Sequence, residues 1–340
     1  MNVLIAGGLT VGMAVAGFLA LQLSPRLTFG DEGLNEYGSA CFSPDAKLIL
    51  ALSADAKDAV RGRILELWDA HTGKKLRQVD DYSFFQAIAN SPYPLAFTPD
   101  GKHFLTWKDG KMVMWETATC KEVKEFPWKG FKFAITPDGN QVISVGRRFV
   151  GLYDLKTGEL LKEHKWEIDK EVPNISISKD GKRFLLYSSW WDVEVWDLSK
   201  FVKTHYYYDY QPPGPDPDGA KPLPYIQTAS LGITFSPDSK GLLYCSRDKE
   251  IITEVDLDTC EVKKTHDIKN VSGVYNIVFN AKGDRLLLGC TSKGRAYLYS
   301  FPECERLKTI EGFGRVQLSP DGKMALTFTK DGRMMLWDLE

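Results

Sequence analysis

The cysteines and histidines of this chain are spaced in a way that argues against a metal centre. The chain has 6 cysteines and 5 histidines. No two cysteines form a Cys-x-x-Cys pair, and none lies at a zinc-ligand spacing from a histidine. We therefore predict no metal and no cofactor, and six free structural thiols, with a disulfide as the alternative for an exported protein. The cysteines are Cys41, Cys120, Cys245, Cys260, Cys290 and Cys304.

The carboxylates also favour structural roles over catalysis. Many aspartates stand in Pro-Asp-Gly sequences, where proline fixes φ, aspartate caps its own backbone and glycine accepts positive φ. The run Asp216-Pro-Asp218-Gly219 is similar to the start of a calcium loop but lacks the later ligands. The scattered histidines assemble no Ser/His/Asp set, and no glycine-rich loop precedes a helix. We predict that the protein is not an enzyme.

Clustered aromatic side chains are the strongest candidates for binding chemistry, because they offer large contact areas at low entropic cost. Two long insertions, at 80–93 and 206–228, carry seven of them, and the second continues into a stiff Pro/Gly/Asp-rich run. Trp190 and Trp191 come just before the second insertion, in the loop between the second and third strands of its repeat. The alternative is that the tyrosines cover the side of the fold and that the tryptophans belong to the core. The candidate partner-binding residues are Trp190, Trp191, Tyr206, Tyr207, Tyr208, Tyr210, Tyr82, Phe84 and Phe85.

The net charge of −2 provides no field that would draw the protein onto nucleic acid. Local basic groups such as Arg147 and Arg148 are interpreted as solvated loop charges. The expected partner is therefore another protein or a peptide. The oligomeric state stays open.

The elements that carry these residues belong to a strand–turn–strand–turn–strand unit that recurs seven times. In its last copy, Pro320-Asp321-Gly322 forms the first turn, Asp331-Gly332 the second, and the third strand ends at Trp337-Asp338. Residues 26–340 divide into repeats of about 45 residues. Repeats at this spacing predict an all-β, seven-bladed propeller. In the other six copies the first turn is entered at Phe42-Ser43-Pro44, Phe97-Thr98-Pro99, Ile135-Thr136-Pro137, Ile177-Ser178-Lys179, Phe235-Ser236-Pro237 and Phe279-Asn280-Ala281.

Four of these units end in Trp-Asp or Trp-Glu and one in Tyr-Asp. In this the chain resembles the WD40 family of β-propellers over everything after residue 25. It departs from that family because it contains no Gly-His dipeptide, whose histidine joins the family's polar network with tryptophan and aspartate. Its Ser-Pro-Asp-Gly turns look more like those of divergent propellers from bacteria.

The resemblance also suggests an alternative function at the central tunnel, where related propeller hydrolases hold a metal with carboxylates. The matching positions at the starts of the inner strands contain no Asp or Glu, so the tunnel hypothesis is the weaker one. These positions are Tyr37-Gly38, Tyr93-Pro94, Gly130-Phe131, Pro173-Asn174, Leu231-Gly232, Tyr275-Asn276 and Gly314-Arg315.

The two ends of the chain predict how the ring closes. The last repeat stops one residue after Trp337-Asp338-Leu339, so its blade lacks an outer strand. Residues 26–29, similar to 306–309, can supply that strand and remove an exposed edge. By family topology this strand begins on the face with the Pro-Asp-Gly turns, here called the turn face. The opposite face, which carries the other loops, is called the loop face.

The N-terminal segment 1–25 carries no charged side chain, and 3–23 is long enough to cross a bilayer as one helix. We expect an uncleaved anchor, which would make the protein membrane-bound and place the ring close to the bilayer. A cleaved signal, leaving a secreted or periplasmic protein, is the alternative. The expected domains are thus the anchor at 1–25 and the propeller at 26–340. The expected function is a membrane-tethered, non-catalytic scaffold that binds a protein or peptide on its loop face.

Overall fold

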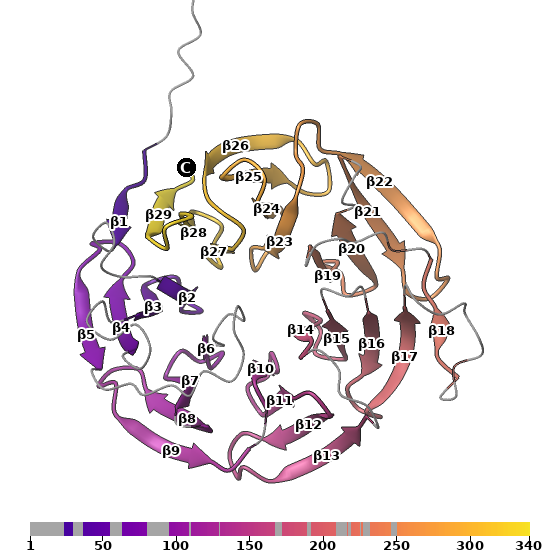
Figure 1. Ribbon diagram of the computed structural model, residues 1–340, viewed down its shortest axis with the longest axis horizontal. Helices are drawn as coiled ribbons and strands as arrows, with labels where there is room; N and C mark the ends of the chain where they lie inside the picture. The colour runs from indigo at the N-terminus through magenta and orange to yellow at the C-terminus, as the bar shows by residue number, and fades with distance from the viewer. Residues whose placement is uncertain are drawn as a thin grey trace, which may run out of the picture.

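The computed structural model of the protein describes residues 24–29, 37–54, 63–79, 95–108, 110–128, 130–166, 172–188, 192–208, 216, 219–224, 226, 232–245 and 250–340. These residues form 29 strands in seven sheets, which stand around a central axis as the blades of a propeller (Figure 1). The predicted seven-bladed, all-β fold is confirmed. The predicted N-terminal helix, at 3–23, lies outside the described residues.

The blades follow one another in chain order and are numbered 1 to 7. The strands of blades 1 to 3 are β2 (Tyr37–Phe42), β3 (Leu48–Ala54), β4 (Arg63–Asp69), β5 (Lys75–Val79), β6 (Leu95–Phe97), β7 (His103–Lys108), β8 (Lys111–Glu116), β9 (Glu122–Phe126), β10 (Lys132–Ile135), β11 (Gln141–Val145), β12 (Phe149–Asp154) and β13 (Leu160–Lys165). The strands of blades 4 and 5 are β14 (Asn174–Ile177), β15 (Arg183–Tyr187), β16 (Val193–Asp197), β17 (Val202–Tyr207), β18 (Lys221–Pro222), β19 (Ile233–Phe235), β20 (Gly241–Cys245), β21 (Ile251–Asp256) and β22 (Val262–Asp267). The strands of blades 6 and 7 are β23 (Val274–Phe279), β24 (Arg285–Cys290), β25 (Arg295–Ser300), β26 (Arg306–Glu311), β27 (Val316–Leu318), β28 (Met324–Phe328), β29 (Met334–Asp338) and β1 (Leu27–Phe29).

In six of the seven repeats, the first turn is built by a short hydroxyl–carboxylate bond, and in blade 6 the Asn280 side-chain amide donates to Asp284 instead. In blade 2, Thr98 Oγ1 donates to Asp100 Oδ1 at 2.6 Å and accepts from the backbone N–H of His103 at 3.1 Å. Gly101 follows with φ of +68°, in the left-handed region that favours glycine. The hydroxyl therefore joins the start of the second strand to the turn. The same Ser/Thr–Asp bond occurs at Ser43–Asp45, Thr136–Asp138, Ser178–Asp180, Ser236–Asp238 and Ser319–Asp321.

The core lies between neighbouring blades, because each sheet buries both of its faces against the next. Blades 1 and 2, for example, share one apolar cluster in which Leu50 and Leu67 pack with Phe104 and Trp115. The rings of Phe104 and Trp115 stack with centroids 6.0 Å apart. Continuous apolar runs on the middle strands thus form most of the contact between neighbouring blades.

Three cysteines occupy a conformationally special position, just before the outer strand. Cys120, Cys260 and Cys304 have φ between +54° and +59°, where two other blades have Gly73 and Gly158. All six cysteines are free thiols, as predicted. Cys120, Cys260 and Cys304 recur because each occupies the same turn position in its blade.

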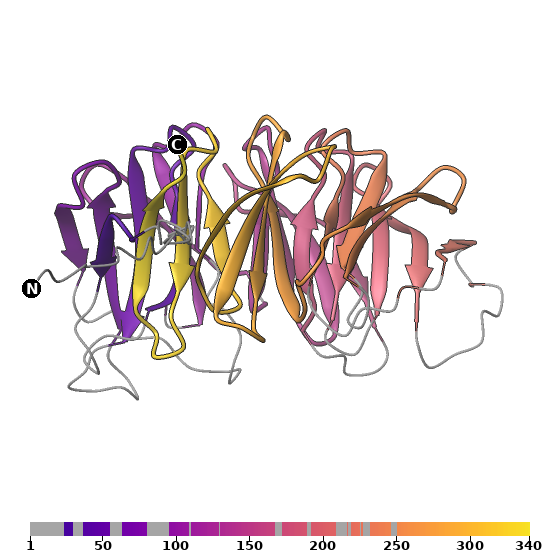
Figure 2. The same ribbon diagram turned by 90° about the horizontal axis from the view of Figure 1, so that it is seen from above.

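The ring is closed by its two ends. β1 pairs with β29 in antiparallel register, with Leu27 opposite Leu336 and Phe29 opposite Met334. Figure 1 shows β1 at the outer edge of the blade that contains the C-terminus. Arg26, directly before β1, donates from Nη1 to Asp338 Oδ1 at 2.7 Å. The predicted closing strand is therefore confirmed, and it begins beside the end of β29, because Leu27 lies opposite Leu336. Figure 2 shows the C-terminus, directly after β29, at the upper face of the ring.

Among the residues that the structure describes, no helix is long and apolar enough to cross a membrane. Residues 1–23, which hold nearly all of the expected anchor, are outside that part of the chain.

Candidate functional site

The tyrosines of the second insertion lie on the outer rim of blade 4. Tyr206 and Tyr207 end strand β17 and are 7% and 9% exposed. Tyr207 packs in the cluster between blades 4 and 5, together with Leu223 and Ile226 from farther along the insertion. These two rings therefore contribute to packing, which is the alternative raised from the sequence. Tyr208, one residue later, is only partly buried.

A buried polar network fixes Tyr208 to its blade. The Tyr208 hydroxyl donates to Glu194 Oε1 at 2.7 Å, and the Trp196 indole N–H donates to Glu194 Oε2 at 3.0 Å. Burial, with the neighbouring Glu194 carboxylate, raises the pKa of Tyr208 above its usual range. Lys203 Nζ lies 5.6 Å from the ring centroid of Tyr208. Opposite charges and hydrogen bonds thus hold this part of the rim in one arrangement.

An ion pair and a fifth strand attach the insertion to blade 4. Lys203 Nζ lies 2.6 Å from Asp216 Oδ2, and their side chains are 11% and 3% exposed. Strand β18 then pairs in parallel with β17, with His205 opposite Lys221. This fifth strand was not predicted. The insertion is consequently anchored at Asp216, at β18 and at the buried Leu223 and Ile226.

The fifth strand also supplies a lysine, Lys221, for a bridge to the next blade. In blades 2 and 3 a lysine of the outer strand makes this bridge. Lys124 donates to the backbone oxygen of Lys156 at 2.6 Å, and Lys162 donates to that of Ser199, each bridging to the next blade. Blade 4 has His205 at the matching position, and burial lowers its pKa below the usual range. Lys221 on β18 instead reaches the Asp258 carbonyl of blade 5 at 3.3 Å.

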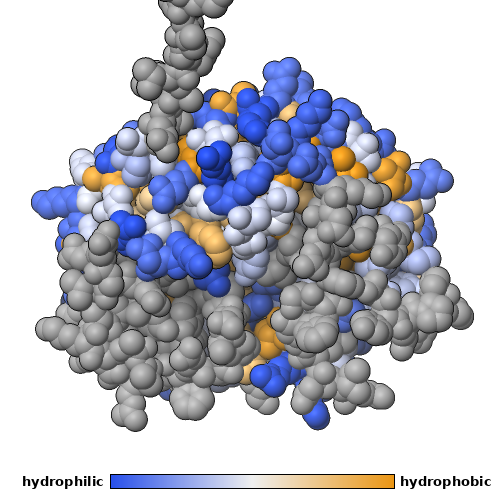
Figure 3. Space-filling model, turned by 45° about the horizontal axis from the view of Figure 1, so that its top comes forward, coloured by the Kyte–Doolittle hydropathy of each residue, from blue (hydrophilic) through white to orange (hydrophobic). Residues whose placement is uncertain are grey.

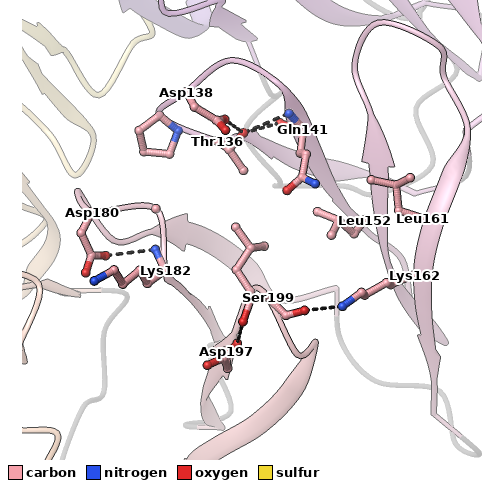
Figure 4. Close-up of a pocket in the computed structure, with 13 residues that line it drawn as sticks. Thr136, Asp138, Gln141, Leu152, Leu161, Lys162, Asp180, Lys182, Asp197 and Ser199 are labelled. Atoms are coloured by element: carbon pink, nitrogen blue, oxygen red, sulfur yellow. Dashed lines mark hydrogen bonds between the residues drawn. The ribbon is translucent and has the colours of Figure 1, made fainter.

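On the turn face, a hollow of about 660 Å³ opens between blades 3 and 4. Its apolar side is formed by Leu152 and Leu161, and its opposite side carries Asp138 and Asp180 from two adjacent turns (Figure 4). Hydrogen bonds from Thr136 lower the pKa of Asp138, so this carboxylate is ionised at neutral pH. The remaining lining residues are Thr136, Pro137, Gln141, Lys162, Gly181, Lys182, Asp197, Leu198 and Ser199.

A repeat-related hollow of about 550 Å³ lies between blades 1 and 2. Leu67 and Leu76 take the places of Leu152 and Leu161. Its charged lining has the opposite excess, because Arg77 and Lys102 face a single carboxylate, that of Glu116. The lining residues are Leu48, Leu67, Leu76, Arg77, Gly101, Lys102, His103, Glu116, Thr117 and Ala118.

The asparagines at the central tunnel join neighbouring blades. Asn174 Oδ1 accepts a hydrogen bond from Lys132 Nζ at 2.9 Å, which links blade 3 to blade 4. Asn276 Oδ1 accepts from the backbone N–H of Val316 at 3.2 Å, which links blade 6 to blade 7. Within the described ranges, no group of three or more His, Cys, Asp or Glu residues could hold a metal ion.

Six of the nine candidate aromatic residues fall outside the described residues, namely Trp190, Trp191, Tyr210, Tyr82, Phe84 and Phe85. The structure brings Tyr206, Tyr207 and Tyr208 together and adds partners that the sequence analysis missed: Glu194, Lys203 and Asp216. The sequence did contain a signal for these partners. The outer strands of blades 1, 2, 3, 5 and 6 have a lysine or arginine at one position, and blade 4 has His205 there, which indicates that this blade is built differently.

Comparison with known proteins supports the repeat assignment. No family model matches the chain. The chain is 26% identical over 176 residues, 48% of its length, to the "WD repeat-containing protein WDS homolog" of Arabidopsis thaliana. The matched region covers 30% of that protein, well under two thirds of its length. Taken with the seven blades, six of four strands and one of five, this similarity supports one structural assignment: the chain is a WD40-like, seven-bladed β-propeller.

Proposed function

We propose that this protein is a non-catalytic scaffold, tethered to a membrane by residues 1–25, that binds a protein or peptide through loops of its propeller. The observation that carries the proposal is the insertion of blade 4, which is fixed at Asp216, at β18 and at Ile226. A loop held at several points presents its remaining residues with little entropic cost on binding. Rigid display of this kind is the mechanism we propose.

The proposed orientation follows from the closing strand. Arg26 lies on the turn face beside Asp338, and the apolar segment ends one residue earlier, at Pro25. A tether at this point brings the turn face toward the bilayer and directs the loop face away from it. We further propose that the protein is a divergent, bacterial-type member of the WD40-like propellers, because its repeats lack Gly-His.

The hydropathy of the described surface marks no binding patch by itself. Figure 3 shows hydrophilic and hydrophobic residues interspersed over the visible face. Single exposed apolar residues recur on the outer strands, including Val123, Val202 and Leu307, each between 44% and 55% exposed. Scattered residues of this kind are ordinary, so we assign the binding role to the clustered aromatic residues of the insertions.

The scaffold is tested by affinity purification of the full-length protein from native membranes, followed by mass spectrometry. The test variant carries alanine at Trp190, Trp191 and Tyr210, and a second variant carries alanine at Tyr82, Phe84 and Phe85. We expect each variant to lose a partner that the wild-type protein retains. The loss should exceed tenfold, since aromatic interface anchors contribute about 2 kcal/mol or more each.

The matched control replaces exposed apolar residues that lie on other outer strands, Val262 and Leu307, with alanine. Thermal unfolding of every variant separates a lost partner from a lost fold. If the folded aromatic variants retain all the partners of the wild-type protein, the loop-face proposal is wrong.

The tether is tested separately, by alkaline extraction of membranes. The full-length protein should resist extraction, and a variant with Val11 and Ala14 replaced by lysine should be released. N-terminal sequencing of the mature chain decides between an anchor and a cleaved signal. A mature chain that begins near residue 26 would overturn the tether.

A further inference from the structure

We propose a second interaction site on the opposite face: the hollow between blades 3 and 4 binds an extended, cationic peptide along the outer strand β13. This inference does not rest on the loop-face scaffold, because it concerns the turn face and different residues. The occupant is a segment of a partner protein in which a lysine or arginine stands next to apolar residues.

The first observation is an unusual apolar pair at the start of β13. Leu160 and Leu161 are 49% and 44% exposed and consecutive. Among the described residues, β13 is the outermost strand of its sheet, and no strand pairs with its outer edge. An edge of this kind accepts an added strand through main-chain hydrogen bonds.

The second observation is that the protein itself uses this mode of binding one blade farther on. There, β18 pairs with β17, Lys221 reaches a carbonyl of the next blade, and Leu223 is buried. The order lysine–proline–leucine therefore describes a segment that pairs with an outer strand of this propeller. In blade 3 the carbonyl that matches Asp258 is that of Ser199, which already accepts from Lys162, so the lysine of an added segment would face the carboxylates of the hollow. In blade 3 the same place, beside β13, has no such segment in the described part of the chain.

The third observation is the charge of the hollow, because it determines whether a bound peptide should be positively or negatively charged. Three carboxylates line it, those of Asp138, Asp180 and Asp197, against Lys162 and Lys182. Lys162 donates to the Ser199 carbonyl (Figure 4), so it is already engaged by the protein. A cationic side chain is thus attracted here, whereas the related hollow between blades 1 and 2 has the opposite excess of charge.

The test uses a fluorescent peptide with the sequence of residues 219–224, Gly-Ala-Lys-Pro-Leu-Pro, and a matched peptide with glutamate in place of lysine. Binding to the purified full-length protein is measured by fluorescence anisotropy at low and high salt. We expect the lysine peptide to bind more tightly than the glutamate peptide, with the difference shrinking as salt is added.

Two surface variants give opposite predictions. Lys182→Glu should tighten binding of the lysine peptide about threefold, because it removes a like charge and adds an opposite one. Leu161→Asn should weaken it about fivefold through lost apolar contact. Leu307→Asn, at the related position on β26, is the control and should change nothing.

Thermal unfolding shows which variants are folded, and a gain in affinity of the folded Lys182→Glu variant keeps the test decisive even if Leu161→Asn fails to fold. The proposal is overturned if the lysine peptide does not bind, if both peptides bind equally, or if neither Lys182→Glu nor Leu161→Asn alters binding. It is also overturned if these variants change self-association in sedimentation runs and leave peptide binding unaffected. In that case the occupant is a second copy of this chain.

Discussion

At the level of single residues, the third-strand tryptophans show how a blade is stabilised in a chain without Gly-His. Trp115 donates from Nε1 to Thr106 Oγ1 at 2.8 Å, and Trp337 donates in the same way to Thr327 at 2.8 Å. In blade 4 the tryptophan uses Glu194 instead. The polar network that the missing histidines placed in doubt is therefore retained in part, through buried threonines of the second strand.

Removal of one threonine hydroxyl tests this role. Thr106→Val keeps the side-chain shape but takes away the acceptor, so we expect a loss of about 1–3 kcal/mol in the free energy of unfolding. Ala51 occupies the matching position in blade 1, where Trp68 Nε1 is buried without a hydrogen-bond partner in the described residues. Ala51→Thr should raise stability. Denaturant midpoints measure both changes, and an unaltered midpoint for Thr106→Val would contradict the assigned role.

The turn aspartates give a prediction for pH. Hydrogen bonds from Ser43, Thr98 and Thr136 hold the pKa values of Asp45, Asp100 and Asp138 below their usual range. A carboxylate with a lowered folded-state pKa contributes stability that is complete above its unfolded pKa of about 4 and is lost as the pH falls through the folded value. The denaturant concentration at the unfolding midpoint should therefore decrease as the pH is lowered below about 4.

The double variant Asp100→Asn and Asp138→Asn serves as the comparison, since asparagine still accepts a hydrogen bond but does not titrate. Its midpoint should decline less steeply than that of the wild-type protein below pH 4. Parallel declines would show that the acid sensitivity arises elsewhere.

At the level of elements, the fifth strand of blade 4 is the feature that distinguishes one blade from the others. Its attachment depends on the buried pair of Lys203 and Asp216. A buried pair often adds little net stability, but removing one partner leaves an uncompensated charge. The pair therefore makes the insertion sensitive to single substitutions.

We predict that Asp216→Ala costs about 3–5 kcal/mol in the stability of this attachment. Hydrogen exchange over residues 219–224 should accelerate accordingly. The double variant Lys203→Met and Asp216→Leu should restore most of the protection. As a control, Lys111→Ala breaks the exposed pair with Glu125 and should cost less than about 1 kcal/mol. Unchanged exchange in Asp216→Ala would show that the apolar anchors suffice.

At the level of the whole molecule, closure of the ring depends on three residues that precede the first blade. Phe29 is 4% exposed and meets Trp68 of blade 1 edge-on, with ring centroids 4.8 Å apart. β1 therefore covers the edge of blade 7 and also packs against blade 1. Loss of this strand would expose β29 as an unpaired edge.

Two truncations separate the closing strand from the proposed anchor. A chain that begins at residue 26 keeps β1 and should unfold with the same midpoint as the full-length protein. A chain that begins at residue 30 should lose at least the burial of Phe29, about 3–5 kcal/mol, and should aggregate. Denaturant unfolding and light scattering measure both effects. Equal midpoints for the two truncated chains would contradict this view of closure.

Local sequence patterns were enough to predict the repeat number, the turn chemistry, the closing strand and every blade strand except β18. These features follow from local patterns, because alternating apolar residues and Ser/Thr-Pro-Asp-Gly turns specify strands and hairpins within one repeat. The closing strand was found by counting, since the last blade lacked a strand that 26–29 could supply.

The packing of the insertion and the pairing of its charged neighbours became visible in the folded chain alone. The tyrosines at 206–208 looked equally suited to binding and to packing, and the choice depended on Asp216, Leu223 and Ile226 folding back onto the rim. The hollow between blades 3 and 4 likewise combines residues of two repeats. Contacts between repeats depend on how the blades are packed and rotated about the ring, and a pattern read within one repeat carries no information about them.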